Sequence, residues 1–352
     1  MIRQWSVLLF CLALTGCGSQ FSSMKALTNQ SSSSEEPLPD TGGNVPAGPG
    51  FKPSICSDLS FDQVEWPSNV STKQLDAFAL AMNITGSFEG HDGWSNIANN
   101  FDEQGLSLGL FNQNLGQGTL QPLMINYQQS TSNKMSSLFS TSQRSSITSM
   151  LNTWLAANGG VLSKATAQTS VQTIPDTSPL DKNFDSQISQ KASNAINQES
   201  VDWAVAQLYL GTEFKTEWKT ALQNLSEDPK YVTLQIEAAI NLHNKAMGYV
   251  TKYRFKTLYS YLFFFDIVVQ NGGISSTTES QYLTWEKSNK TASEATKLLK
   301  LLEYRLLLVN SQYVADVRSR KTSIIKGTGT VHGSSRNYPV EYCSPTWNSS
   351  IF

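Results

Sequence analysis

Hydrophobic residues recur at helical spacing along most of the chain beyond residue 70. Between residues 71 and 88, Leu75, Phe78 and Met82 lie three and four positions apart. This spacing places them on one face of a helix, which we expect to end near Gly86 or just beyond Glu89. The same pattern predicts further helices over residues 119–127, 147–157, 188–225, 230–271 and 293–315.

One region departs from the helical pattern. Residues 99–114 are punctuated by glycine and partly alternate between apolar and polar side chains, which predicts a small β-hairpin or irregular sheet. Residues 262–269 are apolar on every side but too few to cross a membrane, so they predict a central buried helix. The expected fold is therefore mainly α, with two helical lobes around a cleft and a small β-hairpin facing it.

The first 52 residues have a different character. Arg3 precedes a short apolar run over residues 7–14, which ends at Cys17 in the sequence Leu-Thr-Gly-Cys. This pattern predicts a lipoprotein signal peptide over residues 1–16 and lipid attachment at Cys17. The alternative is an ordinary secretory signal with an incidental cysteine. Residues 17–52 are rich in Ser, Gly and Pro and predict a flexible tether, which leaves residues 53–352 as the folded body.

The cysteines and the charge narrow the possibilities further. Cys11 leaves with the signal peptide and Cys17 takes lipid, so Cys56 and Cys343 are expected to form a disulfide in an oxidising compartment. Two unrelated buried thiols are the alternative. The net charge of −2, with 15% charged residues, offers no basic surface for nucleic acid. We expect an exported protein that faces the periplasm or the cell surface and touches the membrane only through its lipid.

Two glycine-rich motifs suggest chemistry that their surroundings do not support. Residues 105–109 match the G-x-S-x-G pattern of serine hydrolases, but the alternating strands and helices that this site requires are absent from the pattern. Only His91, His243 and His332 would be available as its base. Residues 327–333 have the wrong spacing for a dinucleotide loop, and the sequence lacks H-E-x-x-H. We therefore expect no metal and no cofactor.

Acidic residues near the end of the first helix suggest glycosidic chemistry. Glu89 follows Phe88 at the helix end, and Asp102 and Ser107 follow on the predicted hairpin. Cleavage of a glycosidic bond needs a protonated carboxyl group, and an apolar setting beside Phe88 and Met82 would keep Glu89 protonated near neutral pH. A second carboxylate could activate water. A glutamate at a helix end is, however, more often a solvated residue.

These residues, with residues 99–113 and 116–120, resemble the lysozyme superfamily. The D-x-x-G-x-S step from Asp102 to Ser107 is similar to that of chitosanases, in which the aspartate is the general base and the hydroxyl positions water. The S-x-G-L-x-x-Q stretch resembles lytic transglycosylases, which work with one glutamate. Residues 265–272 and 318–333 are similar to the same group, which includes the lysozymes of predatory bacteria that prefer deacetylated peptidoglycan. The resemblance implies a lysozyme-like α+β catalytic domain over residues 53–352.

The resemblance implies single-displacement hydrolysis of a β-1,4 amino-sugar polymer. Glu89 would be the acid, Asp102 the base and Ser107 the hydroxyl that orients water. Four further residues are candidates for contacts with sugars, or else for core packing and hairpin closure: Trp94, Asn112, Gln113 and Asn114. Glu103 replaces the small residue that follows the aspartate in chitosanases, and the gap after Glu89 is shorter. Either Asp102 still faces the cleft, or Glu89 works alone with assistance from the glycan.

The expected partner is peptidoglycan, since a lipoprotein lies beside it, with chitosan a weaker alternative. We expect a monomer. Two rival functions stay open: a lytic transglycosylase, which would leave anhydro-sugar ends, and a non-catalytic glycan-binding lipoprotein of the envelope.

Asp266 is a charged residue within the apolar run at 262–269. A carboxylate buried there would cost several kcal/mol unless it were paired. Arg318 and Arg320 are the available cations, and similar hydrolases brace the helical lobe with a buried arginine–aspartate link. We therefore predict that Asp266 pairs with Arg320 behind the catalytic acid. A partly exposed aspartate is the alternative.

Overall fold

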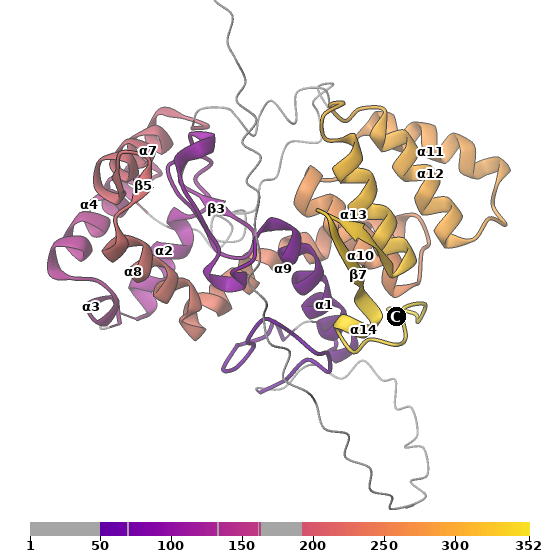
Figure 1. The fold of residues 1–352 in the computed structure, drawn as a ribbon, viewed down its shortest axis with the longest axis horizontal. Coiled ribbons are helices and arrows are strands. Elements are labelled where there is room, and N and C mark those ends of the chain that lie inside the picture. The colour runs from indigo at the N-terminus through magenta and orange to yellow at the C-terminus, as the bar shows by residue number, and fades with distance from the viewer. Residues whose placement is uncertain (1–49, 69, 132–133, 161, 163–191) are drawn as a thin grey trace, which may run out of the picture. The chain divides into compact units, whose positions relative to one another are not determined.

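The computed structural model describes residues 50–68, 70–131, 134–160, 162 and 192–352. The predicted signal peptide, the lipidation site Cys17 and most of the predicted tether lie outside the described residues. The described part is mainly helical with short antiparallel strands (Figure 1), which confirms the expected fold class.

Within the described residues, three small antiparallel sheets lie between the helices along the chain. The α-helices are α1 (Thr72–Glu89), α2 (Gln121–Ser130), α3 (Met135–Leu138), α4 (Thr141–Ala157), α7 (Ala195–Leu208), α8 (Thr216–Glu227), α9 (Pro229–Lys252), α10 (Leu258–Asn271), α11 (Ser276–Ser288), α12 (Glu294–Leu306), α13 (Val314–Lys326) and α14 (Tyr338–Glu341). Two 3-10 helices are η1 (Gly93–Ser95) and η2 (Asn100–Asp102). The strands are β1 (Ile97–Ala98), β2 (Ser107–Leu108), β3 (Gln113–Asn114), β4 (Tyr209–Leu210), β5 (Glu213–Phe214), β6 (Thr328–Val331) and β7 (Ser334–Asn337).

Helix α1 begins and ends where the sequence predicts. The Ser71 side chain accepts a hydrogen bond from the backbone N–H of Gln74 and caps the first turn. At the other end, the backbone N–H of Gly90 donates to the carbonyl of Gly86, so Glu89 is the last helical residue. A Cβ atom on Gly90 would lie 2.0 Å from the side-chain oxygen of Asn96. Glycine at this position therefore lets the chain after the helix approach Glu89 closely.

The predicted hairpin is a three-stranded antiparallel sheet with strand order β1-β2-β3. Ser107 on β2 lies between Ala98 on β1 and Asn114 on β3. Gly109 has φ +87°, and a Cβ atom there would lie 2.3 Å from the side-chain oxygen of Gln235. Since Gln235 accepts a hydrogen bond from the backbone of Leu110, glycine is required for helix α9 to hold the turn after β2.

The structure divides the long helices that periodicity predicted. Within residues 188–225, of which 188–191 lie outside the described part, strands β4 and β5 separate α7 from α8. The phenol of Tyr209 donates to the carbonyl of Gly105, which is distant in sequence, and α7 ends at the residue before Tyr209. Within 230–271, Arg254 adopts φ +61° between α9 and α10. The Glu294 carboxylate then accepts from the backbone N–H groups of Lys256 and Thr257 ahead of α10.

Further differences lie toward the C-terminus. The predicted helix over 293–315 is two helices, α12 and α13, because residues 307–313 form turns between them. Helix α11 and the β6–β7 hairpin were not predicted. Both contain many polar side chains on exposed faces, so the apolar spacing that revealed the other elements is weak there.

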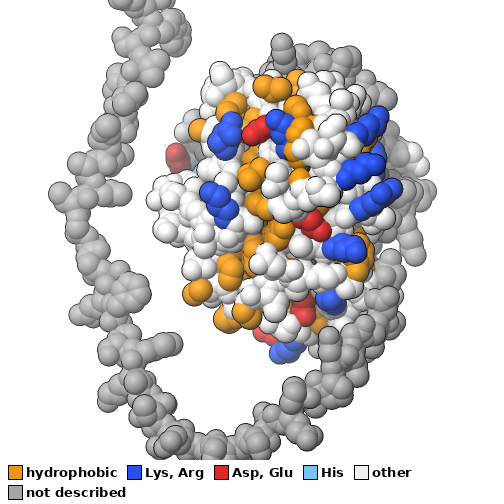
Figure 2. Space-filling view, turned by 90° about the vertical axis from the view of Figure 1, so that its right-hand side faces the viewer, with side chains coloured by type: hydrophobic (Ala, Val, Ile, Leu, Met, Phe, Trp, Pro, Cys, Tyr) orange, Lys and Arg blue, Asp and Glu red, His pale blue; other side chains and the backbone are white. Residues whose placement is uncertain are grey.

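Two clusters of buried apolar side chains form the interior of the described body. One is built on α1, α10, α12 and α13, and the other on α2, α4, α7 and α8, while α9 contributes to both. Residues 262–268 are buried in α10, as predicted for the apolar run. None of the described helices has the length and apolar character needed to cross a membrane. On the face in Figure 2, charged side chains are scattered among uncharged atoms, in keeping with a sequence of 15% charged residues.

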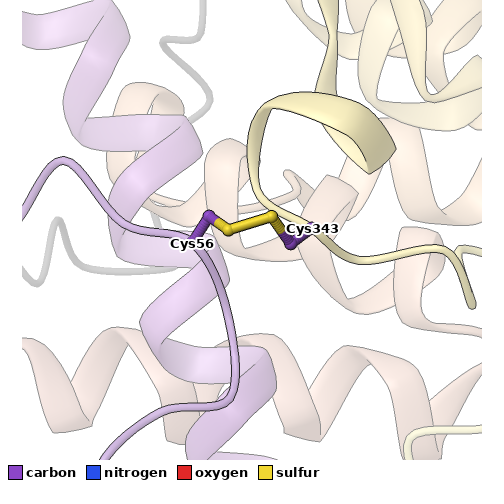
Figure 3. The surroundings of a disulfide bond; sticks show 2 residues. All are labelled: Cys56 and Cys343. Carbon is purple, nitrogen blue, oxygen red and sulfur yellow. A yellow bond between two sulfur atoms is a disulfide. The ribbon is translucent and has the colours of Figure 1, made fainter. Parts of the chain in front are cut away.

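The disulfide predicted from the sequence joins the two ends of the body (Figure 3). Cys56 and Cys343 are bonded, with Cα atoms 5.2 Å apart across a sequence separation of 287. The backbone N–H of Cys56 also donates to the carbonyl of Tyr342 at 3.1 Å. The N-terminal arm, which we define as residues 50–66, is therefore fixed to the C-terminal segment.

Candidate active site

Glu89 lines a cavity of about 1120 Å³, called here the Glu89 cavity. Its walls come from residues 58–63 of the N-terminal arm, the last turns of α1 with the loop that follows, residues 227–232 at the junction of α8 and α9, and the β6–β7 hairpin. Leu110 and Tyr342 complete the lining. The side chain of Glu89 is 22% exposed. A carboxyl group at the end of a buried helix is thus accessible to a ligand in the cavity.

The carboxylate of Glu89 is held by a buried arginine. Nη2 of Arg320 donates to Oε1 of Glu89 at 2.9 Å and to Oδ1 of Asp266 at 2.7 Å. The Arg320 guanidinium also lies 4.6 Å from the centre of the Phe88 ring. Although burial opposes it, Asp266 and Glu89 raise the pKa of Arg320, so the guanidinium stays charged. One cation therefore connects the two acidic side chains.

The setting of Glu89 differs from the one expected from the sequence. Met82 and Phe88 are buried, as an apolar helix end requires. The carboxyl oxygen, however, contacts the guanidinium of Arg320 rather than an apolar wall. The sequence pattern could not show this, because Arg320 lies 231 positions along the chain.

Asp266 forms the ion pair with Arg320 that the sequence predicts, and it has a second cationic partner. Its side chain is fully buried, and its other oxygen accepts from Nζ of Lys321, which is also fully buried. Burial alone would raise the pKa of Asp266, but the charges and hydrogen bonds of Arg320 and Lys321 lower it. Burial lowers the pKa of Lys321 to about 8, against the opposing effect of Asp266. Asp266 is thus a carboxylate that neutralises two buried cations.

The polar contacts continue from Lys321 to a second residue that lines the Glu89 cavity, His332. Nζ of Lys321 donates to Oε1 of Gln270 at 2.6 Å, and Nε2 of Gln270 donates to Oδ2 of Asp316 at 2.9 Å. The other oxygen of Asp316 lies 2.6 Å from Nε2 of His332, which lines the cavity. Sequence reasoning found neither Lys321 nor Gln270. The only local signal was the pair of adjacent cations at 320 and 321.

Two asparagines hold the backbone at the end of α1. Nδ2 of Asn96 donates to the carbonyl of Glu89 at 3.3 Å and to Oδ1 of Asn112 at 2.8 Å. Nδ2 of Asn112 is 3.5 Å from the same carbonyl. These amides fix the position of Glu89. The side chain of Asn112, a predicted sugar contact, therefore bonds to Asn96 and to the backbone carbonyl of Glu89.

The other predicted sugar contacts are buried or bonded within the protein. Trp94 is 6% exposed, and its indole N–H donates to the carbonyl of Ser60 at 2.8 Å. Gln113 is 4% exposed, and Oδ1 of Asn114 accepts from the backbone of Gln117 at 2.8 Å. A buried indole leaves little surface for a sugar, although Trp94 does line the Glu89 cavity.

The predicted base Asp102 and hydroxyl Ser107 lie elsewhere. Asp102 ends η2, where Oδ1 accepts from the backbone N–H of Gln104 at 3.2 Å. Burial raises the pKa of the Asp102 carboxyl, although that hydrogen bond opposes the change. Ser107 is buried in β2. Neither is among the described residues that line the Glu89 cavity.

The described residues contain no cluster of His, Cys, Asp and Glu side chains that could hold a metal ion. The chemistry that the arrangement supports is proton transfer between Glu89 and a ligand in the cavity. The expectation that no cofactor is needed stays a prediction.

Comparisons with known proteins yield one structural likeness. No family model matches the chain, and no curated protein matches it in sequence. The chain is similar in structure to the native chitosanase from Bacillus subtilis MY002, with 14% sequence identity and a TM-score of 0.42. The match covers 75% of this chain and 96% of that chain.

Proposed function

We propose that this protein hydrolyses glycosidic bonds in a β-1,4-linked amino-sugar polymer, with Glu89 as the acid. One observation carries the proposal: the Glu89 carboxyl group is both accessible from a cavity of about 1120 Å³ and fixed by a buried guanidinium. Ligand sites of small molecules usually measure about 300–1,000 Å³, so this cavity has room for more than one sugar ring.

Arg320 supports this chemistry through its position. When Glu89 gives its proton to the glycosidic oxygen, it becomes a carboxylate, and Nη2 of Arg320 is already within 2.9 Å to stabilise that charge. Asp266 balances part of the guanidinium charge at 2.7 Å. The Arg320 guanidinium is therefore shared between Glu89 and Asp266.

The charges around the cavity support an amino sugar with a free ammonium group. Besides Glu89, four acidic residues line the cavity: Asp58, Asp62, Asp92 and Glu227, of which Asp62 is paired with Lys52 at 3.3 Å. Arg336 lines it too, but this guanidinium is paired with Glu341 at 2.8 Å. Because unlike charges raise the local concentration of a ligand, such a lining favours deacetylated polymer over fully acetylated polymer. The lipoprotein signal predicted from the sequence favours peptidoglycan as the physiological polymer.

The proposal assigns the acid alone. The sequence names Asp102 as base and Ser107 as the hydroxyl that orients water, but neither lines the Glu89 cavity. The two groups that flank one glycosidic bond must reach the same sugar. We therefore leave this pair out of the proposed mechanism, and Asp102→Asn enters below as a test.

The decisive experiment is digestion of native peptidoglycan, deacetylated peptidoglycan and chitosan with the full chain, followed by mass analysis of the fragments. We expect fragments from the deacetylated polymers, with a full water added at each new end. Glu89→Gln keeps the shape of the side chain but cannot donate a proton, so it should lose cleavage while the protein stays folded. Glu199→Gln, an exposed change on α7, is the matched control and should cleave normally.

Other outcomes would redirect or end the proposal. Fragments that are short by one water would identify a lytic transglycosylase, in which the same acid acts without hydrolysis. If none of the three polymers is cleaved, or if Glu89→Gln cleaves as the wild type does, the assignment of Glu89 is wrong. Binding of the polymers without cleavage would support the glycan-binding alternative.

A further inference from the structure

His332 is one of two histidines that line the Glu89 cavity among the described residues. It lies in the turn between β6 and β7, and its side chain is 50% exposed. The imidazole meets the ring of Phe88 edge on, with centroids 6.2 Å apart. Phe88 directly precedes Glu89, so the imidazole lies against the same helix end as the proposed acid.

The His332 imidazole contacts the carboxylate of Asp316, which in turn accepts a hydrogen bond from Gln270. Nε2 of His332 lies 2.6 Å from Oδ1 of Asp316, whose second oxygen accepts from Gln270 at 2.9 Å. A neutral imidazole that donates from Nε2 to a carboxylate keeps Nδ1 as its basic nitrogen. Within the described residues Nδ1 has no hydrogen-bond partner. This nitrogen is therefore available to a ligand or a water molecule in the cavity.

The backbone of the turn places His332 in the left-handed region. His332 has φ +50° and Gly333 has φ +79°, between the paired residues Val331 and Ser334. A two-residue hairpin turn with both φ angles positive favours Asn followed by Gly, and histidine is among the residues that enter this region more often than most. The tight turn therefore carries the imidazole at the edge of the Glu89 cavity, which His332 lines.

The two titratable groups are connected behind the cavity by bonded side chains. The order is Glu89, Arg320, Asp266, Lys321, Gln270, Asp316 and His332. Both ends of this series line the cavity, and its middle members Asp266 and Lys321 are fully buried. A rigid connection of this kind keeps the distance and orientation between an acid and a base constant, as catalysis by two groups requires.

We propose that His332, oriented by Asp316, accepts the proton of the attacking water in the cleavage for which Glu89 is the acid. The inference rests on the proposed function. The proton of Glu89 passes to the glycosidic oxygen as the bond between that oxygen and the anomeric carbon breaks. The water oxygen bonds to the anomeric carbon, and the water proton passes to Nδ1 of His332. Transfer of that proton through solvent to the Glu89 carboxylate restores both groups.

The charged groups that face the imidazole come from three elements. Asp316 and Arg320 belong to α13, Glu89 belongs to α1, and Arg336 belongs to β7. Arg320 and Arg336 lie 4.6 and 5.8 Å from the centre of the Phe88 ring, against which His332 also packs. Any pH dependence assigned to His332 has to be measured with these four groups unchanged.

The test compares four full-length variants on deacetylated peptidoglycan and chitosan between pH 4 and 9. His332→Asn suits the turn, because asparagine is favoured there, but it cannot take up the proton. We expect kcat to fall about 100-fold or more, KM to change little, and the acidic limb of the pH profile to disappear. Asp316→Asn should give a smaller loss, since the imidazole remains but its orientation is less constrained. Glu199→Gln, an exposed change on α7 outside the cavity lining, is the control and should retain full activity.

The remaining variant, Asp102→Asn, separates the two candidate bases. If it removes the acidic limb while His332→Asn keeps it, Asp102 is the base and the inference is wrong. A His332→Asn protein within threefold of wild-type kcat, or one whose loss is equal at every pH, would also overturn it. If the wild-type chain cleaves none of the polymers, the proposed function fails and the inference fails with it. Melting curves of each variant show whether a loss reflects unfolding.

Discussion

Replacing Asp266 with asparagine should strongly destabilise this protein, because it leaves two buried cations without their carboxylate. Asp266 accepts from Arg320 at 2.7 Å and from Lys321, and all three side chains are at most 5% exposed. Asparagine keeps one accepting oxygen, but its amide N–H₂ group replaces the other. That group would face the N–H donor of Arg320 or Lys321 and could not accept from it. The charge and at least one hydrogen bond are therefore lost together.

The size of the effect follows from how the two cations can respond. Lys321, whose pKa is lowered by burial to about 8 even with Asp266 present, can release its proton at neutral pH once the carboxylate is gone. Arg320 cannot, and it retains only Glu89 as an acidic partner. Breaking one side of a buried ion pair costs about 3–5 kcal/mol. For a body of this size, that loss lowers the melting temperature by about 6–10 °C.

The assay is thermal and urea unfolding of Asp266→Asn, Lys321→Met and the double variant. Since Met removes the second buried cation, the double variant should lose less than the sum of the single losses. Asp62→Asn is the matched control: Asp62 pairs with Lys52 at 3.3 Å, and both side chains are more than 70% exposed. This surface pair should contribute less than about 1 kcal/mol. Additive losses, or an Asp266→Asn protein that melts within 2 °C of the wild type, would refute the reasoning.

Three further predictions concern other parts of the molecule. Burial lowers the pKa of His243 to about 4, so the unfolded chain binds a proton first as pH falls from 6.5 to 4. Stability should then drop by roughly 3 kcal/mol, and urea unfolding of His243→Gln should show a flatter dependence on pH. Replacing Cys56 and Cys343 with serine should cost up to about 5 kcal/mol, and reductant should lower the unfolding midpoint of the wild type but leave that of the variant unchanged. Gly90→Ala would place Cβ 2.0 Å from the Asn96 oxygen, so we expect a loss of about 1–3 kcal/mol and a larger loss of glycan cleavage, measured as kcat beside a melting curve.

The sequence predicted those elements whose cause is local. The spacing of apolar residues located α1, and the unbroken apolar run located the buried part of α10. The breaks inside the long helices were missed because distant groups make them. Tyr209 donates to Gly105, and Glu294 accepts from the backbone ahead of α10, contacts that no window of neighbouring residues contains.

In the candidate site, the sequence predicted a contact only where the neighbours of one residue made a partner necessary. Asp266 sits among apolar neighbours, so it had to find a cation, and the pairing with Arg320 followed. Asp102 carries no such requirement, since the order of residues on a hairpin does not say which cavity they face. The series of bonds that ends at His332 joins side chains from α10, α13 and a hairpin turn, and only the fold brings these together.

The disulfide has a mechanical consequence for a protein held at its N-terminal end. A load that enters through the N-terminal arm reaches Cys56 before it reaches the residues that line the Glu89 cavity. From there it divides into two parallel paths, one along residues 57–66 and one across the sulfur atoms to Cys343. The second path reaches the β6–β7 hairpin without passing through the arm. If the chain is anchored through Cys17, as the sequence predicts, a pull on the anchor therefore reaches both the N-terminal arm and the β6–β7 hairpin through Cys56.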